Sequence, residues 1–306
     1  MLVPKKLTNK DFLSSSDLTR EEIINILGLA KLFKNNSLDI DLKNKVLGLI
    51  FNKSSTRTRV SFQVAMSRLG CSTVDLDPKT SQIGRGETIK DTARVLSRYC
   101  DVLAIRTFNH SDLEDYAKWS SKPIINALTD LEHPCQALAD FLTIKEEFED
   151  FNNIKLTFIG DGNNVAHSLI LCGSILGVEV CIACPKGFEP KSSILQKANE
   201  INGKNIKITD DLDDAVNGAN VLYTDVWSSM GEENNKEDKD KFFSGFTINT
   251  DLINKASKDV IVLHCLPAYR GKEICDEVIE SKNSRIFDQA ENRMHVQQAL
   301  LYSLLS

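Results

Sequence analysis

The chain has 306 residues, a formal net charge of -6 and 42% hydrophobic residues, which is enough for two domains that each bury a core. The acidic balance excludes a nucleic-acid-binding surface, because no basic cluster outweighs the acidic side chains. The N-terminus lacks the apolar segment of a secretory signal and no uncharged run is suited to cross a membrane, so we expect a cytoplasmic protein without a membrane partner.

The first chemically informative feature is an expected strand-to-helix junction. Residues 46–51 are an apolar run of strand length, and apolar residues then recur at helical spacing from Phe62 until Gly70. The junction, residues 55–59, reads Ser-Thr-Arg-Thr-Arg. Hydroxyls, guanidinium groups and unpaired amides at a helix start are suited to bind a phosphate. We therefore predict an anion site; the alternative is an ordinary helix cap with two solvated arginines.

Further polar residues follow along the first half of the chain. Gln82 lies in a glycine-containing loop, where it either reaches a ligand or belongs to a plain surface loop. Arg106 follows an expected strand, at the end where open α/β sheets bind ligands. His133 precedes a helix expected to begin at Pro134, with Gln136 in its first turn. A purely structural histidine is the alternative, but the shared helix start favours a functional one.

The strand and helix pattern restarts after the acidic, turn-rich segment 146–153, where we place a domain boundary. A strand–turn–helix–strand unit follows. Its turn begins with Gly160 and Gly162, like a dinucleotide-binding fingerprint, but Val165 occupies the third glycine position. A nicotinamide dehydrogenase is therefore disfavoured, and the asparagines at 163 and 164 are better suited to a small ligand.

The last part of the chain places three more polar residues near element ends. Asp225 follows an expected strand, Cys265 follows another, and Arg293 lies in the first turn of a terminal helix that Asn292 is expected to cap. The charged stretch 232–241 is interpreted as a solvated loop. Two successive α/β units with polar residues at strand ends indicate a site formed by two domains.

The eight cysteines are scattered, as in proteins of a reducing compartment. Cys181 and Cys184 are separated by two residues, but they lie in an apolar stretch expected to be a buried strand. Residues three apart on a strand face opposite sides, and the sequence has no second pair of this spacing, so we expect no metal site.

Four short motifs resemble those of the aspartate/ornithine carbamoyltransferase family. They are S-T-R-T-R at 55–59, H-P-C-Q at 133–136, D-x-W-x-S-M-G at 225–231 and H-C-L-P at 264–267. They occur in the family's order, and the resemblance covers essentially the whole chain. Cys135, where the aspartate-specific members usually carry threonine, and the last two motifs favour the ornithine branch of the family.

The resemblance implies an α/β fold of two doubly wound domains with parallel sheets and an active site in the cleft between them. Residues 1–148 would bind carbamoyl phosphate, with a C-terminal helix, 292–306, packed back on them. Residues 149–291 would bind ornithine. The implied assembly is a homotrimer in which Gln82 comes from a neighbouring subunit.

The resemblance also assigns roles residue by residue. The implied catalytic residues are Thr58, Arg106, His133, Asp225 and Cys265. The residues expected to bind carbamoyl phosphate are Ser55, Thr56, Arg57, Thr58, Gln82, Arg106, His133, Pro134, Cys135, Gln136, Cys265, Leu266 and Arg293. Those expected to bind ornithine are Asn164, Asp225, Ser229 and Met230. No metal ion or organic cofactor is implied.

The implied activity is transfer of the carbamoyl group of carbamoyl phosphate to the δ-amine of L-ornithine, giving L-citrulline and phosphate, in arginine metabolism. Arginine biosynthesis is the favoured setting, and arginine breakdown is the alternative. Direct attack by an amine needs no covalent intermediate, so Cys265 is interpreted as a substrate contact rather than a nucleophile. The alternatives are a carbamoyltransferase for another amine such as putrescine, and a non-catalytic relative that only binds carbamoyl phosphate.

Overall fold

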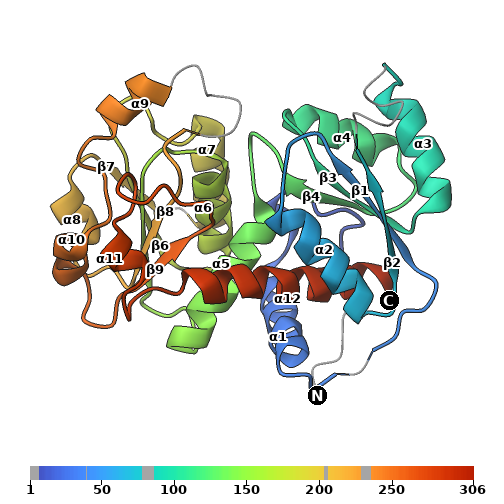
Figure 1. Cartoon of the computed structure of the whole chain (residues 1–306), viewed down its shortest axis with the longest axis horizontal. Helices are drawn as coiled ribbons and strands as arrows, with labels where there is room; N and C mark the ends of the chain where they lie inside the picture. The colour runs from blue at the N-terminus through green and yellow to red at the C-terminus, as the bar shows by residue number, and fades with distance from the viewer. Residues whose placement is uncertain (1–6, 39, 78–85, 203–205, 229–235) are drawn as a thin grey trace. The chain divides into compact units, whose positions relative to one another are not determined.

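The computed structural model describes residues 7–38, 40–77, 86–202, 206–228 and 236–306, and Figure 1 follows the chain from its N-terminus to its C-terminus. The chain divides into two compact units. Unit 1 comprises Met1–Leu142 and Glu291–Ser306, and unit 2 comprises Thr143–Ala290. Each unit contains a parallel sheet flanked by helices, which confirms the two-domain α/β architecture expected from the sequence.

The sheet of unit 1 has the strand order β2-β1-β3-β4, and every neighbouring pair is parallel. Its strands are β1 (Val46–Phe51), β2 (Ser72–Leu76), β3 (Val102–Arg106) and β4 (Ile124–Leu128). The chain runs outward from β1 to β2 and then returns to β3 on the other side of β1. The strand order therefore reverses between β1 and β3, and ligands of open α/β sheets bind beyond the carboxyl ends of the strands at such a point.

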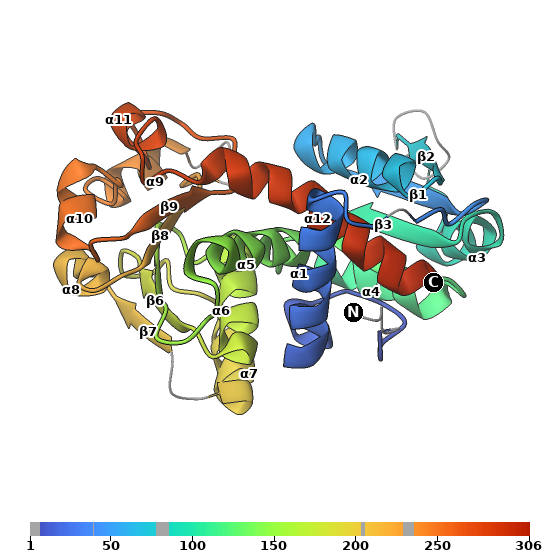
Figure 2. The same ribbon diagram turned by 90° about the horizontal axis from the view of Figure 1, so that it is seen from below.

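Helices cover both faces of this sheet. The helices of unit 1 are α1 (Arg20–Lys34), α2 (Arg57–Arg68), α3 (Ile89–Tyr99), α4 (His110–Trp119), the first part of α5 (Pro134–Phe148) and most of α12 (Ile286–Leu305), with a short 3₁₀ helix, η1 (Ser15–Asp17), ahead of them. In Figure 2, α2 lies on one side of the sheet and α4 on the other. β1 and β3 are almost entirely buried, whereas the edge strand β2 is largely exposed.

The sheet of unit 2 has the order β7-β6-β5-β8-β9, again parallel throughout. Its strands are β5 (Lys155–Ile159), β6 (Glu179–Ala183), β7 (Ile206–Thr209), β8 (Val221–Thr224) and β9 (Ile261–His264). Its helices are α6 (Asn164–Leu176), α7 (Ser192–Asn202), α8 (Leu212–Val216), α9 (Lys236–Phe242), α10 (Thr250–Lys255), α11 (Asp276–Ile279) and the start of α12 (Ile286–Leu305). Here the strand order reverses between β5 and β8, so the turns after these two strands are the expected ligand position.

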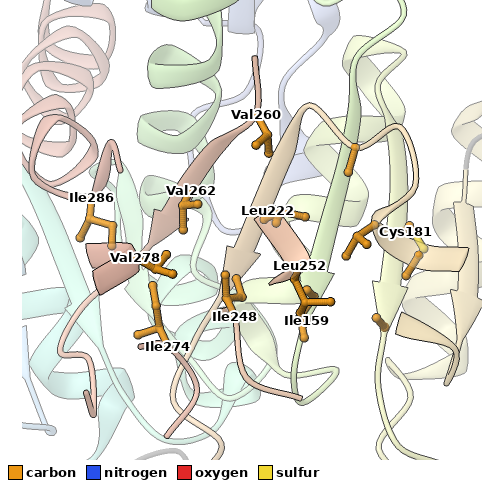
Figure 3. Packing of buried hydrophobic residues seen from close by; sticks show 14 of the residues in the cluster. Ile159, Cys181, Leu222, Ile248, Leu252, Val260, Val262, Ile274, Val278 and Ile286 are labelled. Carbon is orange, nitrogen blue, oxygen red and sulfur yellow. The ribbon is translucent and has the colours of Figure 1, made fainter. Parts of the chain in front are cut away.

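A continuous apolar cluster holds one face of the unit 2 sheet against its covering segments (Figure 3). Ile159, Leu222 and Val262 come from three adjacent strands, and Leu252 and Val278 come from α10 and α11. Burying such side chains stabilises the fold by about 1.5–3 kcal/mol each. The cluster therefore fixes the strands whose carboxyl ends carry Asp225 and Cys265.

The two closely spaced cysteines belong to this interior. Cys181 is fully buried in the apolar cluster and Cys184 is almost fully buried. Burial raises the pKa of the Cys184 thiol to about 12, which keeps it protonated and a poor metal ligand. All eight cysteines, each within the described residues, are free thiols.

The terminal helix differs from its prediction. Asn292 does not cap it, because α12 already begins at Ile286, and the segment 286–291 contains no glycine or proline to stop a helix there. Asn292 is instead buried inside the helix, where its side-chain oxygen accepts a hydrogen bond from Lys34 Nζ at 2.8 Å. Among the helices that the structure describes, none is long and apolar enough to cross a membrane.

Candidate active site

The predicted phosphate junction lies at the carboxyl end of β1, where the chain enters α2. Thr56 occupies the N-cap position with helical dihedral angles, and its side chain makes no capping hydrogen bond within the described structure. An ordinary capping role therefore does not describe Thr56. Thr58 follows in the first turn and is buried. The amides of this turn have no intrahelical acceptor, and the helix dipole favours an anion beside them.

The two arginines of the junction have different surroundings. Arg59 forms an ion pair with Asp75 on β2, and its guanidinium carbon lies 5.1 Å from the ring centre of Phe51, so Arg59 ties α2 to the sheet. The Nε atom of Arg57 is buried and has no hydrogen-bond partner among the residues described. An unsatisfied buried donor is costly unless a ligand accepts from it. Arg57, rather than Arg59, is therefore the candidate phosphate ligand.

Arg106 is brought beside the junction by the sheet register. It is the last residue of β3 and pairs with Phe51, the last residue of β1. Its carbonyl oxygen accepts a hydrogen bond from the amide of Asn52 at 2.8 Å, and its side chain is buried. Arg106 thus lies at the carboxyl end of its strand, as predicted, and the structure shows that the strand order reverses there.

His133 immediately precedes α5, which begins at Pro134 as expected. The imidazole is buried, and burial lowers its pKa well below the ordinary value of 6.5, with further lowering by the positive charges of Arg293, Arg106 and Arg57. All four side chains therefore share one electrostatic environment in unit 1. The imidazole is neutral at pH 7, so it offers one N–H donor and one lone pair.

The segment before α5 is held by a buried acid. The carboxylate of Glu132 accepts hydrogen bonds from the hydroxyl of Ser14 and, at 2.9 Å, from the amide of Ser15. Glu132 itself is 1% exposed. The N-terminal segment around η1 therefore fixes the position from which His133 projects, a role that no motif in the sequence signalled.

Gln136 links two charged side chains of unit 1. Its Oε1 accepts a hydrogen bond from Arg293 at 3.0 Å, and its Nε2 donates to Asp140 at 2.7 Å. These contacts fix which end of the amide is which. Arg293 comes from the middle of α12 rather than from its first turn, and its contact with Gln136 joins two residues that the resemblance assigned to the same substrate. Asp140, one turn further along α5, is fully buried and was not anticipated from the sequence.

Cys135 lies between these residues but is buried, and burial raises the pKa of its thiol to about 12. A thiol with so high a pKa is not a nucleophile at neutral pH. Its Sγ instead donates a weak hydrogen bond to the carbonyl oxygen of Asn126 at 3.5 Å. Cys135 therefore supports the start of α5 through packing.

In unit 2, Asp225 is the centre of a second polar group. It follows β8, and its Oδ1 accepts from the thiol of Cys265 at 3.0 Å and from the amide of Val226 at 2.8 Å. Its Oδ2 accepts from Asn163 Nδ2 at 2.9 Å. The thiol that donates to a carboxylate is protonated, so this contact agrees with Cys265 as a substrate contact rather than a nucleophile.

Asn163 was suggested by the sequence as a polar group for a small ligand, but the resemblance assigned it to no substrate. It is the N-cap of α6, and its Oδ1 accepts from the amides of Val165 and Ala166. The predicted ligand Asn164 is the next residue and the first of the helix. An asparagine before a helix signals a cap, but its second contact, with Asp225, joins residues 62 positions apart. That contact cannot be read from local spacing.

Three predicted site residues, Gln82, Ser229 and Met230, lie outside the described residues. Asp225, His264 and Cys265 bring potential ligand atoms within 4.8 Å of one another. Both ring nitrogens of His264 are already hydrogen-bonded, to Leu266 and to Glu273. This cluster is therefore arranged as a hydrogen-bonded network rather than as a metal site.

Comparison with known proteins matches both units. Residues 10–146 match the carbamoyl-P binding domain of the aspartate/ornithine carbamoyltransferases, and residues 152–304 match the Asp/Orn binding domain. The chain is 75% identical to the ornithine carbamoyltransferase of Prochlorococcus marinus strain MIT 9312, over 100% of both chains. It is 52% identical to that of Nostoc sp. strain PCC 7120, over 98% of both.

Solved structures agree with these matches. The ornithine carbamoyltransferase of Pyrococcus furiosus superposes with a TM-score of 0.92 at 47% identity, over 97% of both chains. The anabolic ornithine carbamoyltransferase of Campylobacter jejuni superposes with a TM-score of 0.91 at 41% identity, over 97% of this chain and 99% of that one. Both domains of the family match this chain, and the relatives align over nearly its whole length. The chain therefore belongs to the aspartate/ornithine carbamoyltransferase family.

Proposed function

We propose that the chain transfers the carbamoyl group of carbamoyl phosphate to the δ-amine of L-ornithine, giving L-citrulline and phosphate. The observation that carries this proposal is the group of three arginines, Arg57, Arg106 and Arg293, around a neutral His133 in unit 1. Three guanidinium groups suit an acyl phosphate, and a neutral imidazole can donate to its carbonyl oxygen. The relatives named above supply the choice of ornithine.

Carbamoyl phosphate is assigned to unit 1. Arg57, Ser55, Thr56 and the first-turn amides of α2 bind the phosphate, with Arg106 beside them. Thr58, Arg106 and His133 donate to the carbonyl oxygen, on which negative charge develops as the amine attacks. Removing one such preorganised donor typically lowers the rate by ~10²–10³. Gln136 and Arg293 hold the carbamoyl amide.

Ornithine is assigned to unit 2. The carboxylate of Asp225 pairs with the cationic α-amino group, and Asn164, Ser229 and Met230 complete the contacts to the amino acid. Cys265 and the main chain of Leu266 contact the carbamoyl group. Unit 1 thus binds the phosphate and unit 2 binds the amino acid, whereas residues of both units contact the carbamoyl group that the amine attacks.

The chemical step forms one bond and breaks one. The lone pair of the neutral δ-amine attacks the carbamoyl carbon, and the carbon–oxygen bond to phosphate breaks with its electron pair on phosphate. The nitrogen loses a proton, which phosphate accepts. A primary amine has a pKa of about 10.4, so less than ~0.1% is neutral at pH 7. We therefore expect kcat/KM for ornithine to rise with pH until a second group titrates.

An amine panel tests the substrate. Purified protein is incubated with carbamoyl phosphate and, separately, L-ornithine, putrescine, L-lysine or L-aspartate, and both carbamoylated product and phosphate are measured. We expect equimolar citrulline and phosphate with ornithine and much slower reaction with the others. Faster reaction with putrescine would overturn the choice of ornithine. Carbamoyl phosphate binding without transfer to any amine would indicate the non-catalytic alternative.

We also propose a homotrimer in which Gln82 reaches the site of a neighbouring subunit. Exposed apolar side chains support an interface on unit 1: Val60 and Val64 on α2 are 50% and 37% exposed, and Val74 on the edge strand β2 is 45% exposed. Exposed edge strands and apolar patches are usually covered. Light scattering should give about three times the 34.2 kDa chain mass, and a monomer at working concentration would contradict the assembly.

The proposed setting is arginine biosynthesis in the cytoplasm. The free thiols of all eight cysteines, which the described residues include, suit a reducing compartment, and one similar structure is that of an anabolic ornithine carbamoyltransferase. Deleting the gene should create a growth requirement that citrulline relieves and ornithine does not. Normal growth without either supplement would argue against a biosynthetic role.

A further inference from the structure

A buried histidine and glutamate lie behind the segment that carries Cys265 and Leu266. His264 is the last residue of β9, and Glu273 lies nine positions further along the chain. Their side chains are 0% and 1% exposed, and His264 Nε2 is 3.2 Å from Glu273 Oε1. Neither belongs to the residues assigned to a substrate above. A buried carboxylate beside a buried imidazole is costly unless the pair fixes something in place.

The hydrogen bonds determine the tautomer of His264. The amide of Leu266 can only donate, and it points to His264 Nδ1 at 2.9 Å, so Nδ1 carries the lone pair. In a neutral imidazole the proton then resides on Nε2, which donates to Glu273. The same Glu273 oxygen accepts from the amide of Tyr269. The two side chains therefore connect the main-chain amides of Leu266 and Tyr269 across the loop after β9.

The loop needs this support because of its backbone. Leu266 has a φ of 58°, a left-handed conformation that side chains other than glycine rarely adopt. The amide of Leu266 donates a hydrogen bond to the side chain of His264. The amide of His264, two residues earlier, donates to Gln289 Oε1 at 2.9 Å. The residue between them is Cys265, whose thiol donates to Asp225. The braced backbone thus sets the direction of the Cys265 side chain.

We propose that His264 and Glu273 are a positioning pair for the proposed reaction: they hold Cys265 and the Leu266 main chain in the orientation that the ornithine-binding group around Asp225 requires. Neither side chain touches a substrate. The inference rests on the proposed function for its kinetic readout, but the contacts themselves are tested without it.

Substitutions that separate the two ring nitrogens test the pair. In His264→Asn the side-chain oxygen takes the place of Nδ1 and accepts from Leu266, whereas the link to Glu273 is lost. In His264→Gln the side-chain nitrogen takes the place of Nε2 and the acceptor for Leu266 is lost. Glu273→Gln keeps an oxygen that accepts from both partners, and Glu273→Ala keeps none. The conservative member of each pair should therefore retain more function.

The kinetic readout compares the change in KM for ornithine with the change in KM for carbamoyl phosphate. We expect His264→Gln and Glu273→Ala to raise KM for ornithine on the order of 10-fold, as for the loss of one or two hydrogen bonds. KM for carbamoyl phosphate should rise less, by about threefold at most, because the phosphate is bound by unit 1 and only the carbamoyl group is contacted by Cys265 and Leu266. His264→Asn and Glu273→Gln should stay within about threefold. A matched control is Thr157→Val, which removes a buried hydrogen bond to the Ala215 carbonyl in the same unit and should leave both KM values unchanged.

Two results would overturn the positioning role. One is an equal change in both KM values that scales with the loss of thermal stability, because this would indicate a general destabilisation of the unit. The other is no difference between His264→Asn and His264→Gln. Amide hydrogen exchange in a peptide covering residues 265–270 provides a readout independent of catalysis: His264→Gln should accelerate it and His264→Asn should not. If wild type forms no citrulline, the proposed function fails, whereas the exchange result still decides whether the pair holds the loop.

Discussion

Substitution of Asn163 tests how the ornithine-binding group is built. Asn163 does two things at once: its Oδ1 caps α6, and its Nδ2 donates to Asp225 at 2.9 Å. Asn163→Ser keeps a good capping residue but is too short to reach Asp225. Asn163→Asp keeps the capping oxygen and replaces the donor with a second carboxylate oxygen. The two variants therefore change the contact with Asp225 while sparing the helix cap.

The expected sizes follow from the geometry. A hydrogen bond to a charged group contributes about 1.5–3 kcal/mol, so Asn163→Ser should lower kcat/KM for ornithine by roughly 10- to 150-fold. In Asn163→Asp, two negative charges at the 2.9 Å separation of the present contact would repel by roughly 6 kcal/mol at an effective dielectric constant of about 20. Asp225 must then turn away or take up a proton, and the loss should exceed that of the serine variant.

The assay is steady-state citrulline formation with each substrate varied in turn, together with thermal unfolding of each variant. Both variants should unfold close to wild type, because the cap is retained, and KM for carbamoyl phosphate should be unchanged. If Asn163→Ser retains kcat/KM for ornithine within twofold of wild type, the contact with Asp225 does not organise the site and the reasoning is wrong.

Three further predictions concern unit 1. Because burial lowers the pKa of His133 in the folded protein, the unfolded state takes up a proton at higher pH than the folded state. The free energy of unfolding should therefore fall as pH drops below about 6.5, by up to ~1.4 kcal/mol per pH unit. Urea titrations of wild type and His133→Asn should differ in this pH dependence, and identical slopes would contradict a neutral buried imidazole. Cys135, with its pKa raised to about 12, should resist iodoacetamide at pH 8.5 in the native protein and react after denaturation, and rapid native labelling seen by mass spectrometry would refute its burial. Asp140→Leu should raise KM for carbamoyl phosphate by about 10-fold, because Gln136 loses the buried hydrogen bond to a charged group that orients its side chain. Asp140→Asn should have a smaller effect. Equal effects of the two variants would show that the carboxylate does not orient Gln136.

The sheet architecture was predictable because its signals are local. Val46–Phe51 is a short apolar run followed by turn residues, and the structure places the strand at the predicted bounds. The strand of the predicted strand–turn–helix–strand unit, Lys155–Ile159, is a similar apolar run. β7 was not recognised, because Ile206–Thr209 is a four-residue edge strand with exposed positions and little hydrophobic signal. The start of α12 was misplaced because asparagine is a common N-cap residue. In the structure the side-chain oxygen of Asn292 instead accepts a hydrogen bond from Lys34 of α1.

The residues of the short motifs were predictable from the sequence, but the contacts that hold them in place were not. Residue chemistry alone does not distinguish Arg57 from Arg59; the resemblance assigned only Arg57 to the substrate. The structure supplies the physical difference, because Arg59 pairs with Asp75 and lies over the ring of Phe51. Glu132 carries no motif, because its partners lie more than 100 positions away. Long-range hydrogen bonds of this kind depend on the strand register, which single-sequence patterns do not specify.

Other parts of the site were recognised by resemblance. Arg293 was assigned to the carbamoyl group from the family's pattern, and the structure shows the 3.0 Å contact with Gln136 that holds it in unit 1. No periodicity would have predicted that contact across 157 positions. Local chemistry therefore identified the anion-binding turn, whereas the supporting residues behind it required the structure.

The central claim is that unit 1 binds the acyl phosphate through its arginines while unit 2 binds the amine. Equilibrium titration of carbamoyl phosphate into wild type, Arg57→Ala and Asp225→Asn tests it most directly. Losing the cation that pairs with a bound phosphate shielded from water should weaken binding by roughly 3–5 kcal/mol in Arg57→Ala, and Asp225→Asn should bind like wild type. Equal affinity of all three proteins, or equal loss in both variants, would contradict the claim.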